Sequence, residues 1–336
     1  MFMNCRLDDS RFDNANGTGI SFKGSVGNAT SFRATAFTEV DFSSTSFPSS
    51  DFRSVDFHGV DFRRSNLTDA KFDYAVLLKA TFASATLVGA SFFESQFSGK
   101  ADFSSANLDS ATFSNSNLVK ADFSKANLSN TKFKDAKFDE ADFRNTRLDG
   151  AALRECTFSG ADFRGASGFQ TDFTAANFVE TDLRGVRCQE CKFDKSEFGY
   201  SRLNRVSFRN GSFEKASFRK AKLEDADFTS SVLTETVFEQ PYLRDVHFAA
   251  AHLTRTMFNC DNLHDIDFKK AILDSVDFSK VEIRNCDFSG ADLSTVIWNP
   301  KNLRKNTYDA ATKFPAGYTP NPKQMVMVRG SRPLPP

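Results

Sequence analysis

Phe or Leu recurs at every fifth position through almost the whole chain, and we call each of these positions a beat. Of the 39 phenylalanines in 336 residues, all but Phe93, Phe169 and Phe314 lie on this grid. The grid covers residues 2–97, shifts by one inserted residue, and resumes over residues 103–308. A repeat this regular constrains the fold more than any other feature, because one small structural unit must recur along the chain.

A five-residue period fits neither a helix, which needs apolar spacing of about 3.6, nor a strand, which needs about 2. It fits a short straight segment followed by a corner. The residue two before each beat is small, as Ala121 is before Phe123 and Ala126 before Leu128. These two positions suit the inside of a narrow tube, and the other three carry polar residues. Four such sides would close a coil of about 20 residues, and coils would stack at ~4.8 Å.

The pattern resembles the pentapeptide-repeat family, whose consensus is a small residue, Asp or Asn, Leu or Phe, and two polar residues. That order stands in residues 121–125 (Ala-Asp-Phe-Ser-Lys), 161–165 (Ala-Asp-Phe-Arg-Gly) and 291–295 (Ala-Asp-Leu-Ser-Thr). The resemblance covers about residues 1–310 and implies an all-β fold, a right-handed quadrilateral β-helix. We therefore expect about 15 four-sided coils, forming a rod of roughly 70 Å at the strand spacing.

Each coil of a solenoid contacts only its neighbours, so chain length alone does not indicate several domains. We predict one β-helix over residues 1–308, with a one-residue register insertion at 98–102. Residues 309–328 are expected to form a C-terminal cap or a self-association segment, since open strands at the end of a stack need covering. Residues 329–336, which are rich in proline, are predicted to be a flexible tail. Whether Phe169 and the insertion protrude stays open.

The beat residues predict aromatic stacking along the walls. After Phe218 the beat alternates between Phe and Leu, which places Phe on two opposite walls of a four-sided coil. Burial of each large side chain would contribute roughly 1.5–3 kcal/mol, and ring stacking would add to it. One predicted wall consists of Phe138, Phe158, Phe178, Phe198, Phe218, Phe238, Phe258, Phe278 and Trp298.

Composition excludes several functions. Lys and Arg number 43 and so do Asp and Glu, which argues against direct nucleic-acid binding through phosphates. No apolar run approaches the length of a membrane span, so no membrane association is expected. The repeat starts at Phe2 with no signal-peptide pattern before it, and a cytoplasmic, bacterial protein is the expectation.

The cysteines are predicted to be reduced and structural. Both Cys188 and Cys191 fall on inward positions, so their Cys-x-x-Cys spacing is read as packing in preference to a redox or zinc pair. Cys260 is expected to face outward. The other cysteines, each two residues before a beat, are expected to be buried as small apolar residues: Cys5, Cys156 and Cys286.

No catalytic, cofactor-binding or metal-binding residues are predicted. All histidines fall on outward positions, and His247 is expected to lie beside Asp267 one coil later. The tube is filled by its own side chains, which leaves no ligand cavity. We therefore expect a protein that is not an enzyme and needs no cofactor.

One outward column is acidic. Arg144, Arg164 and Arg184 stand two residues after three of its members, which suggests a ladder that neutralises itself. Asp41 and Asp61 continue the column before the insertion. Stacked like charges repel, and the family resemblance implies that such a stripe could imitate the phosphates of DNA. The candidate stripe consists of Asp102, Asp122, Asp142, Asp162 and Asp182.

A second outward set is apolar and lies late in the chain, each member directly before a beat. Earlier residues at the same repeat positions are polar, as Thr112 and Asn177 are. A rimmed apolar patch indicates a partner surface, although β-branched residues also favour strands in general. The candidate partner surface consists of Val232, Val237, Tyr242, Met257, Ile272 and Ile297.

These features favour a non-enzymatic, rod-like scaffold that binds another protein of unknown identity through the apolar set. A homodimer through the C-terminal segment is a further expectation. The alternative that the resemblance implies is a DNA-mimicking protein that binds or protects a topoisomerase such as gyrase. A secreted bacterial effector is the second alternative.

Overall fold

The structure, a computed structural model, describes residues 1–328 and divides the chain into two compact units, Met1–Asp182 (unit 1) and Leu183–Pro336 (unit 2). Within each unit, backbone segments pair in parallel with segments one coil away, as Asp122 does with Asp142. The turns number about 16. The predicted all-β, four-sided solenoid is therefore confirmed. The predicted tail, residues 329–336, lies outside the described residues.

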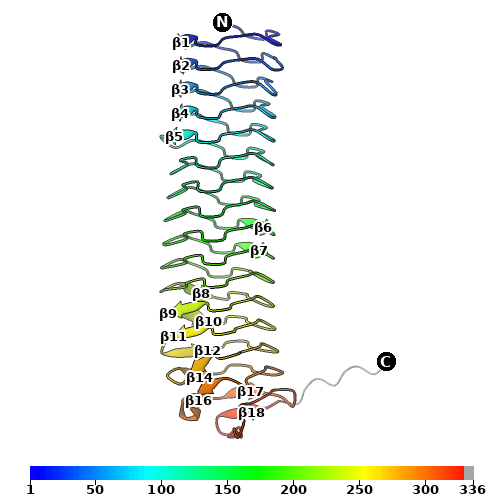
Figure 1. Ribbon diagram of the computed structural model, residues 1–336, viewed down its shortest axis with the longest axis vertical. Helices are drawn as coiled ribbons and strands as arrows, with labels where there is room; N and C mark the ends of the chain where they lie inside the picture. Colours follow the sequence, from blue (N-terminus) through cyan, green and yellow to red (C-terminus); the bar gives the residue numbers. More distant parts are fainter. Residues whose placement is uncertain (329–336) are drawn as a thin grey trace, which may run out of the picture. The chain divides into compact units, whose positions relative to one another are not determined.

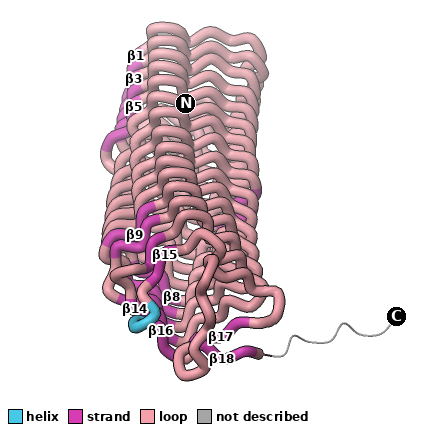
Figure 2. Tube along the Cα trace, turned by 60° about the horizontal axis from the view of Figure 1, so that its bottom comes forward, coloured by secondary structure: helices cyan, strands magenta, loops and turns pink. Residues whose placement is uncertain are grey.

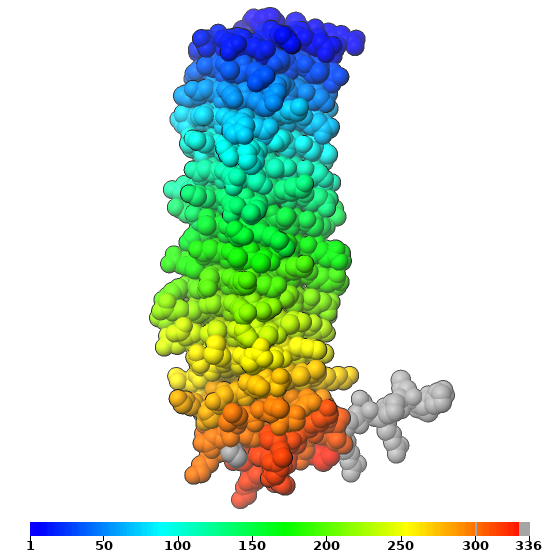
Figure 3. Space-filling model, viewed as in Figure 1, coloured from blue at the N-terminus to red at the C-terminus, as the bar shows by residue number. Residues whose placement is uncertain are grey.

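Unit 1 stacks its coils through short parallel strands. The first five strands form one sheet in sequence order, with Gly17 beside Phe37 and Phe57 beside Leu77. Figure 1 shows these strands one after another on a single wall, and Figure 3 shows successive coils of the unit as layers. The strands of unit 1 are β1 (Asn16–Thr18), β2 (Ala36–Thr38), β3 (Asp56–His58), β4 (Val76–Leu78), β5 (Gln96–Ser98) and β6 (Ser167–Phe169).

The interior of unit 1 is filled by the beat residues and the small residues two positions before them. Phe123 is fully buried and stacks on Phe103 and Phe143, with ring centroids 5.0 and 5.2 Å apart. Where the small residue is polar, its hydroxyl bonds to the backbone; Thr131 Oγ1 donates to the Leu108 carbonyl at 3.0 Å. Both inward positions are therefore satisfied without water.

Most corners have a residue in the left-handed conformation two positions after the beat. The beat carbonyl accepts a hydrogen bond from the amide three residues later, as Phe103 does from Ala106 at 3.0 Å. The residue between them, Ser105, has φ of 57°. Positive φ at the third residue is the geometry of a type II turn. Residues other than glycine occupy most of these corners, so packing of the stack must offset the cost of the left-handed conformation.

The register insertion is absorbed at one corner. Thr81 pairs with Asp102, a separation of 21 residues where neighbouring coils have 20. Gly99 and Lys100 at this corner are exposed and have positive φ. Phe169 is also exposed, to 43%, so its ring points outward and does not fill the coil that holds Gly168.

Unit 2 continues the same repeat with more regular strands. One sheet runs β8-β10-β12-β14-β16 and a second pairs β9 with β11. The elements of unit 2 are β7 (Arg187–Gln189), β8 (Lys222–Glu224), β9 (Val237–Glu239), β10 (Tyr242–Arg244), β11 (Met257–Asn259), β12 (Asn262–His264), β13 (Asp277–Phe278), β14 (Glu282–Arg284), β15 (Ile297–Trp298), the 3-10 helix η1 (Pro300–Asn302), β16 (Leu303–Arg304), β17 (Asn306–Tyr308) and β18 (Met325–Met327).

The predicted aromatic wall is present in unit 2. Phe238 stacks between Phe218 and Phe258, with centroids 4.9 and 5.0 Å away. At the end of the wall, Trp298 turns from this stack and contacts Tyr318 at 5.0 Å. Strand β18 pairs in parallel with β17, and Figure 2 shows both beside the last coils. Phe314 and Tyr318 of the segment predicted as a cap therefore contact Trp298, the last aromatic side chain of the wall.

The repeat also extends further than the sequence predicts. Lys313 pairs with Asp292, again 21 residues apart, so Asp309–Thr312 accommodates a second one-residue insertion. Phe314 then lies where the next beat belongs and contacts Trp298 at 6.1 Å. Phe314 is off the sequence grid only because of this shift.

One cysteine prediction is wrong. Cys188 and Cys191 are both buried, as expected, but they form a disulfide and are not free thiols. Adjacent inward positions of one coil bring their side chains together. Cys5 is half-buried because it lies in the first coil, and Cys260 is also half-buried where outward exposure was expected. Cys156, together with Cys286, is buried as predicted.

Within residues 1–328, no helix is both long and apolar enough to cross a membrane.

Candidate functional site

The outward apolar residues of unit 2 form columns across neighbouring coils. Val237 pairs with Met257 in the β9–β11 sheet. Val232 pairs with His252, and His252 pairs with Ile272 on the adjoining wall. Every member except Val237, which is half-buried, is at least 40% exposed: Val232, Tyr242, Met257, Ile272 and Ile297. We call this set the apolar surface.

A groove of about 930 Å³ follows one corner of unit 2 and is lined by Tyr242 and Met257 of the apolar surface. The cause lies in two residues at inward positions. Pro241 lacks an amide donor for the turn, and Asp261 cannot be buried without a partner for its charge. Pro241 is half-buried and Asp261 is exposed, so the corner opens where other coils close. The sequence already carries a signal at Asp261, a charged residue at the inward position two before Leu263, although no groove was predicted there.

Cys260 lies in this corner groove. Burial, followed by the charge of Asp261, raises the pKa of its thiol to about 11. The thiolate is the nucleophilic form, so this cysteine is almost wholly protonated at neutral pH. The groove therefore offers contact surface and no activated nucleophile.

The acidic column is present in unit 1 as predicted. Parallel bridges connect its members in one line: Asp102, Asp122, Asp142, Asp162 and Asp182. Arg164 Nη2 lies 2.6 Å from Asp162 Oδ2, and Lys100 Nζ lies 3.6 Å from Asp122 Oδ2. The column thus carries cations close beside its carboxylates.

Asp142 shows how the column is balanced. Burial alone would raise the pKa of its carboxyl, but hydrogen bonds and charge from Arg144 outweigh that effect and lower the pKa. Arg144 Nε donates to both carboxylate oxygens at 2.9 Å. The guanidinium pKa rises correspondingly. A carboxylate held in this way presents little free charge to a ligand.

No group of three or more His, Cys, Asp or Glu side chains in residues 1–328 could hold a metal ion. His247 lies 3.9 Å from Asp267 across coils, as predicted, and both side chains are accessible to water. This is an ordinary surface pair.

Two family models match the sequence. The one described as pentapeptide repeat region matches residues 1–72, 106–198 and 201–271. The one described as pentapeptide repeats (8 copies) matches residues 61–99 and 262–297. The comparison with curated proteins gives no match.

Solved structures with similar folds include HetL, a pentapeptide repeat protein involved in heterocyst differentiation regulation from the cyanobacterium Nostoc sp. strain PCC 7120. It is 19% identical, the match covers 79% of this chain and 90% of that chain, and the TM-score is 0.21. Full-length QnrB1, a plasmid-mediated fluoroquinolone resistance protein, is 21% identical over 64% of this chain and 94% of that chain, with a TM-score of 0.32. Rfr23 from the cyanobacterium Cyanothece 51142 is 18% identical over 43% and 87%, with a TM-score of 0.19. Scores this low carry no argument about function.

Proposed function

The chain belongs to the pentapeptide-repeat family, and from that premise we propose that it is a non-enzymatic scaffold that binds another protein. The observation that carries the proposal is the apolar surface of unit 2. Val237 and Met257 are direct neighbours across coils, and Val232 and Ile272 lie on either side of His252 in one column. Tyr242 and Ile297 have polar neighbours across coils, Lys222 and Asp277. Contiguous exposed apolar residues on a polar protein mark interaction surfaces.

The groove at the Pro241 and Asp261 corner adjoins the apolar surface and supports its role in binding a partner. Tyr242 is 52% exposed and Met257 48% exposed, and both line the groove. An aromatic ring and a flexible thioether beside a concave surface suit a partner's apolar side chain. We place the centre of the docking surface at this corner, with Ile272 at its edge.

The test is a pull-down from the source organism with Met257→Asp/Ile272→Asp as the variant. Both residues are outward, so the coil should fold while charge at the surface prevents apolar contact. We expect the wild type to capture a partner that the variant loses. Equal capture by both proteins would contradict the proposal.

Unit 1 offers a matched control. Thr112→Asp/Asn177→Asp introduces the same charges at the same repeat positions, on half-buried polar residues. This variant should retain the partner. Loss in both variants would indicate a nonspecific effect of charge and would count against the apolar surface.

Self-association through the C-terminal segment is a related proposal. On β18, Val326 is 52% exposed and Met327 57% exposed. An exposed strand edge with apolar side chains can pair with a second copy. Light scattering on Val326→Lys against the wild type tests it; a mass that does not change with the substitution excludes this segment as the interface.

A second candidate function is topoisomerase binding by DNA mimicry. It is supported by the line of five aspartates in unit 1, and it is weakened by the arginines that neutralise them. Purified gyrase should then be captured by the wild type and by the Met257→Asp/Ile272→Asp variant, but not by Asp122→Lys/Asp142→Lys. No capture of gyrase by the wild type would remove this candidate.

A further inference from the structure

We propose that unit 2 carries a second recognition site, a column of cationic side chains that binds acidic residues of an extended polypeptide segment. The inference deepens the proposed function, on which it rests, by naming the chemistry of the partner. The site lies on the sheet formed by β10, β12, β14 and β16, and consists of Arg244, Arg284 and Arg304, with the imidazole of His264 between the first two in the same line. We call this set the cationic column.

The repeat position of these residues is the one that Arg144 and Arg164 occupy in unit 1. There, each arginine is held by the aspartate two residues earlier in its own coil. In unit 2 the corresponding earlier residues are Tyr242 before Arg244 and Asn262 before His264. After Asn204 and Glu224 at the same repeat position, basic residues occupy it again from Arg244 to Arg304, without the aspartates that accompany them in unit 1.

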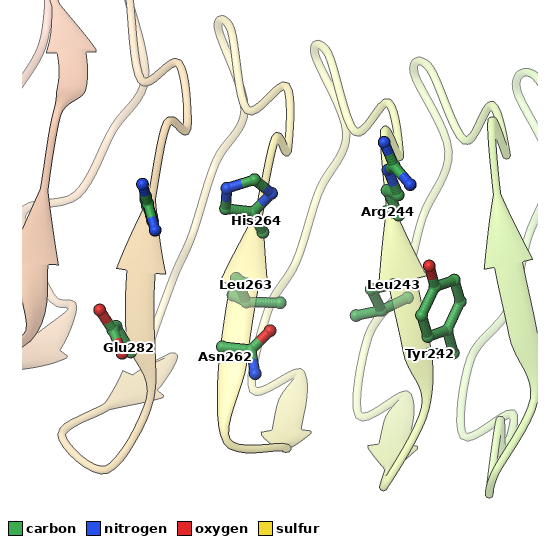
Figure 4. A pocket seen from close by; sticks show the side chains of 8 residues that line it. Tyr242, Leu243, Arg244, Asn262, Leu263, His264 and Glu282 are labelled. Atoms are coloured by element: carbon green, nitrogen blue, oxygen red, sulfur yellow. The ribbon is translucent and has the colours of Figure 1, made fainter.

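Backbone register places the cations on one face. Arg244 pairs with His264, His264 with Arg284, and Arg284 with Arg304. Neighbouring strands are ~4.8 Å apart, so the three guanidinium groups and the imidazole form a line across the strands. Figure 4 shows Arg244 and His264 aligned on successive strands, with Tyr242, Asn262 and Glu282 in the parallel line.

The acids near the column satisfy it only in part. Asp245 lies 3.4 Å from Arg244, and Asp265 lies 2.7 Å from His264. Glu282 stands two residues before Arg284 in the same coil. Its carboxylate, however, accepts a hydrogen bond from Nε of Arg304 at 2.8 Å and does not pair with Arg284. Among residues 1–328, no ion pair within 4.0 Å is formed by Arg284. Its guanidinium, with five donors, remains available for a carboxylate.

The surface around the column has room for a ligand segment. A shallow groove of about 500 Å³ is lined by Tyr242, Arg244 and His264, with Arg284 at its far side. Tyr242 also belongs to the apolar surface, so the two sites adjoin. Tyrosine and arginine together are typical of the residues that dominate protein interfaces.

A polypeptide fits this surface better than a nucleic acid. In unit 2, Lys and Arg number 24 against 19 Asp and Glu, a net charge of +5. Asp245, Asp265 and Glu282 lie among the cations and would repel a continuous line of phosphates. Nucleic-acid binding draws on many phosphate contacts, whereas a peptide can place a few carboxylates between these acids.

The test uses a fluorescently labelled peptide of about ten residues with alternating Glu and Val, because alternate residues of an extended chain share one face. Fluorescence anisotropy would measure its binding to the full chain. The variant Arg244→Gln/Arg284→Gln should bind at least about tenfold more weakly, since each loses a charge-assisted contact. Arg144→Gln/Arg164→Gln, at the same repeat position in unit 1, should bind as the wild type does.

Three results would overturn the inference. One is equal binding of the Glu peptide and a matched Gln peptide. Another is unchanged binding by the Arg244→Gln/Arg284→Gln variant. The third is tighter binding of a short DNA duplex than of the Glu peptide, which would point to phosphate recognition. Circular dichroism on each variant confirms that folding is intact.

Failure of this inference can be told apart from failure of the proposed function. If Arg244→Gln/Arg284→Gln captures the cellular partner normally while Met257→Asp/Ile272→Asp does not, the cationic column is excluded and the scaffold proposal stands. If the apolar variant keeps the partner and the arginine variant loses it, the cationic column is supported and the apolar surface is not.

Discussion

Units 1 and 2 follow the same pattern of inward residues, but their net charges have opposite signs. Residues 1–182 contain 19 Lys and Arg against 24 Asp and Glu, a net charge of −5, whereas residues 183–336 contain 24 against 19, a net charge of +5. The chain's net charge of zero conceals this division. Only two of every five residues face inward, so the other three can vary without altering the fold.

The difference is sharpest at one repeat position. In unit 1, Arg144 bonds to Asp142 of its own coil. In unit 2, Arg284 follows Glu282 by the same spacing, yet Glu282 bonds to Arg304. The same side chain therefore neutralises an acid in one unit and is left available in the other. Substitution of the outward residues in one column, while the inward residues stay the same, can therefore give this fold a surface that recognises a partner.

The largest expected loss of stability comes from removing a buried Phe, and it tests whether the interiors of units 1 and 2 are equivalent. Phe143 stacks on Phe163 at 4.5 Å in unit 1, and Phe238 stacks on Phe258 at 5.0 Å in unit 2. Replacing either with Ala leaves a cavity in a filled tube and should cost about 3–5 kcal/mol. Chemical denaturation of both variants would measure the loss.

A comparable loss in the two variants would support one shared interior. A difference of more than about 2 kcal/mol, beyond the usual spread for such sites, would show that the units differ inside as well as outside. Phe169→Ala is the control. Because the Phe169 ring is exposed, its removal should change stability by less than about 0.5 kcal/mol.

Sequence alone could predict the inward positions, because a narrow tube admits only a large apolar side chain and a small neighbour. That rule located Phe123 and Ala121 in the core, and it placed Val237 beside Met257 across coils. It also located the acidic column, since a strict period transfers directly into vertical alignment. Whether the apolar surface binds a partner stays a prediction.

Corners and ends were harder to predict, because they depend on how the backbone responds to an unsuitable residue. Asp261 at an inward position signals that its coil cannot close normally, but the pattern does not predict that the corner opens into a groove. It also does not predict that Phe314 returns to the beat after a second insertion. The Cys188–Cys191 disulfide depends on the distance between neighbouring inward side chains. The cationic column is visible in sequence only through a missing aspartate, as at Tyr242.

A smaller loss of stability is expected when Arg144 is replaced, and it would distinguish Arg144, which pairs with Asp142, from Arg284. Arg144→Met removes the hydrogen bonds to Asp142, and the exposed setting limits the cost to about 0.5–1 kcal/mol. Arg284→Met should cost nothing measurable, since no carboxylate is left behind. The depressed pKa of Asp142 gives stability that is present above the carboxyl's unfolded pKa and is lost as pH falls through the folded one.

Thermal unfolding at neutral and acidic pH would measure this contrast. The stability gap between Arg144→Met and the wild type should close on acidification, whereas Arg284→Met should match the wild type throughout. A double-mutant cycle with Asp142→Asn isolates the pair. Equal costs for the two arginine variants at neutral pH would break the proposed distinction between the units.

The smallest expected effect concerns the place where the repeat continues into the cap. Lys313 Nζ lies 2.9 Å from Asp292 Oδ2, and this contact, with help from Ser294, lowers the pKa of the Asp292 carboxyl to about 2. Lys313→Met should raise that pKa toward its ordinary value of 3.8, although Ser294 still donates to the carboxylate. The lowered pKa stabilises the folded state at pH values above the pKa of the unfolded carboxyl, and this stability is lost as pH falls to about 2. The variant should therefore lose under about 1 kcal/mol at neutral pH and nothing in strong acid.

Carboxyl NMR titration would follow the pKa of Asp292 directly, with exposed Lys323→Met as the control. An Asp292 pKa that does not move would mean that Lys313 contributes only its backbone pairing to the last coil.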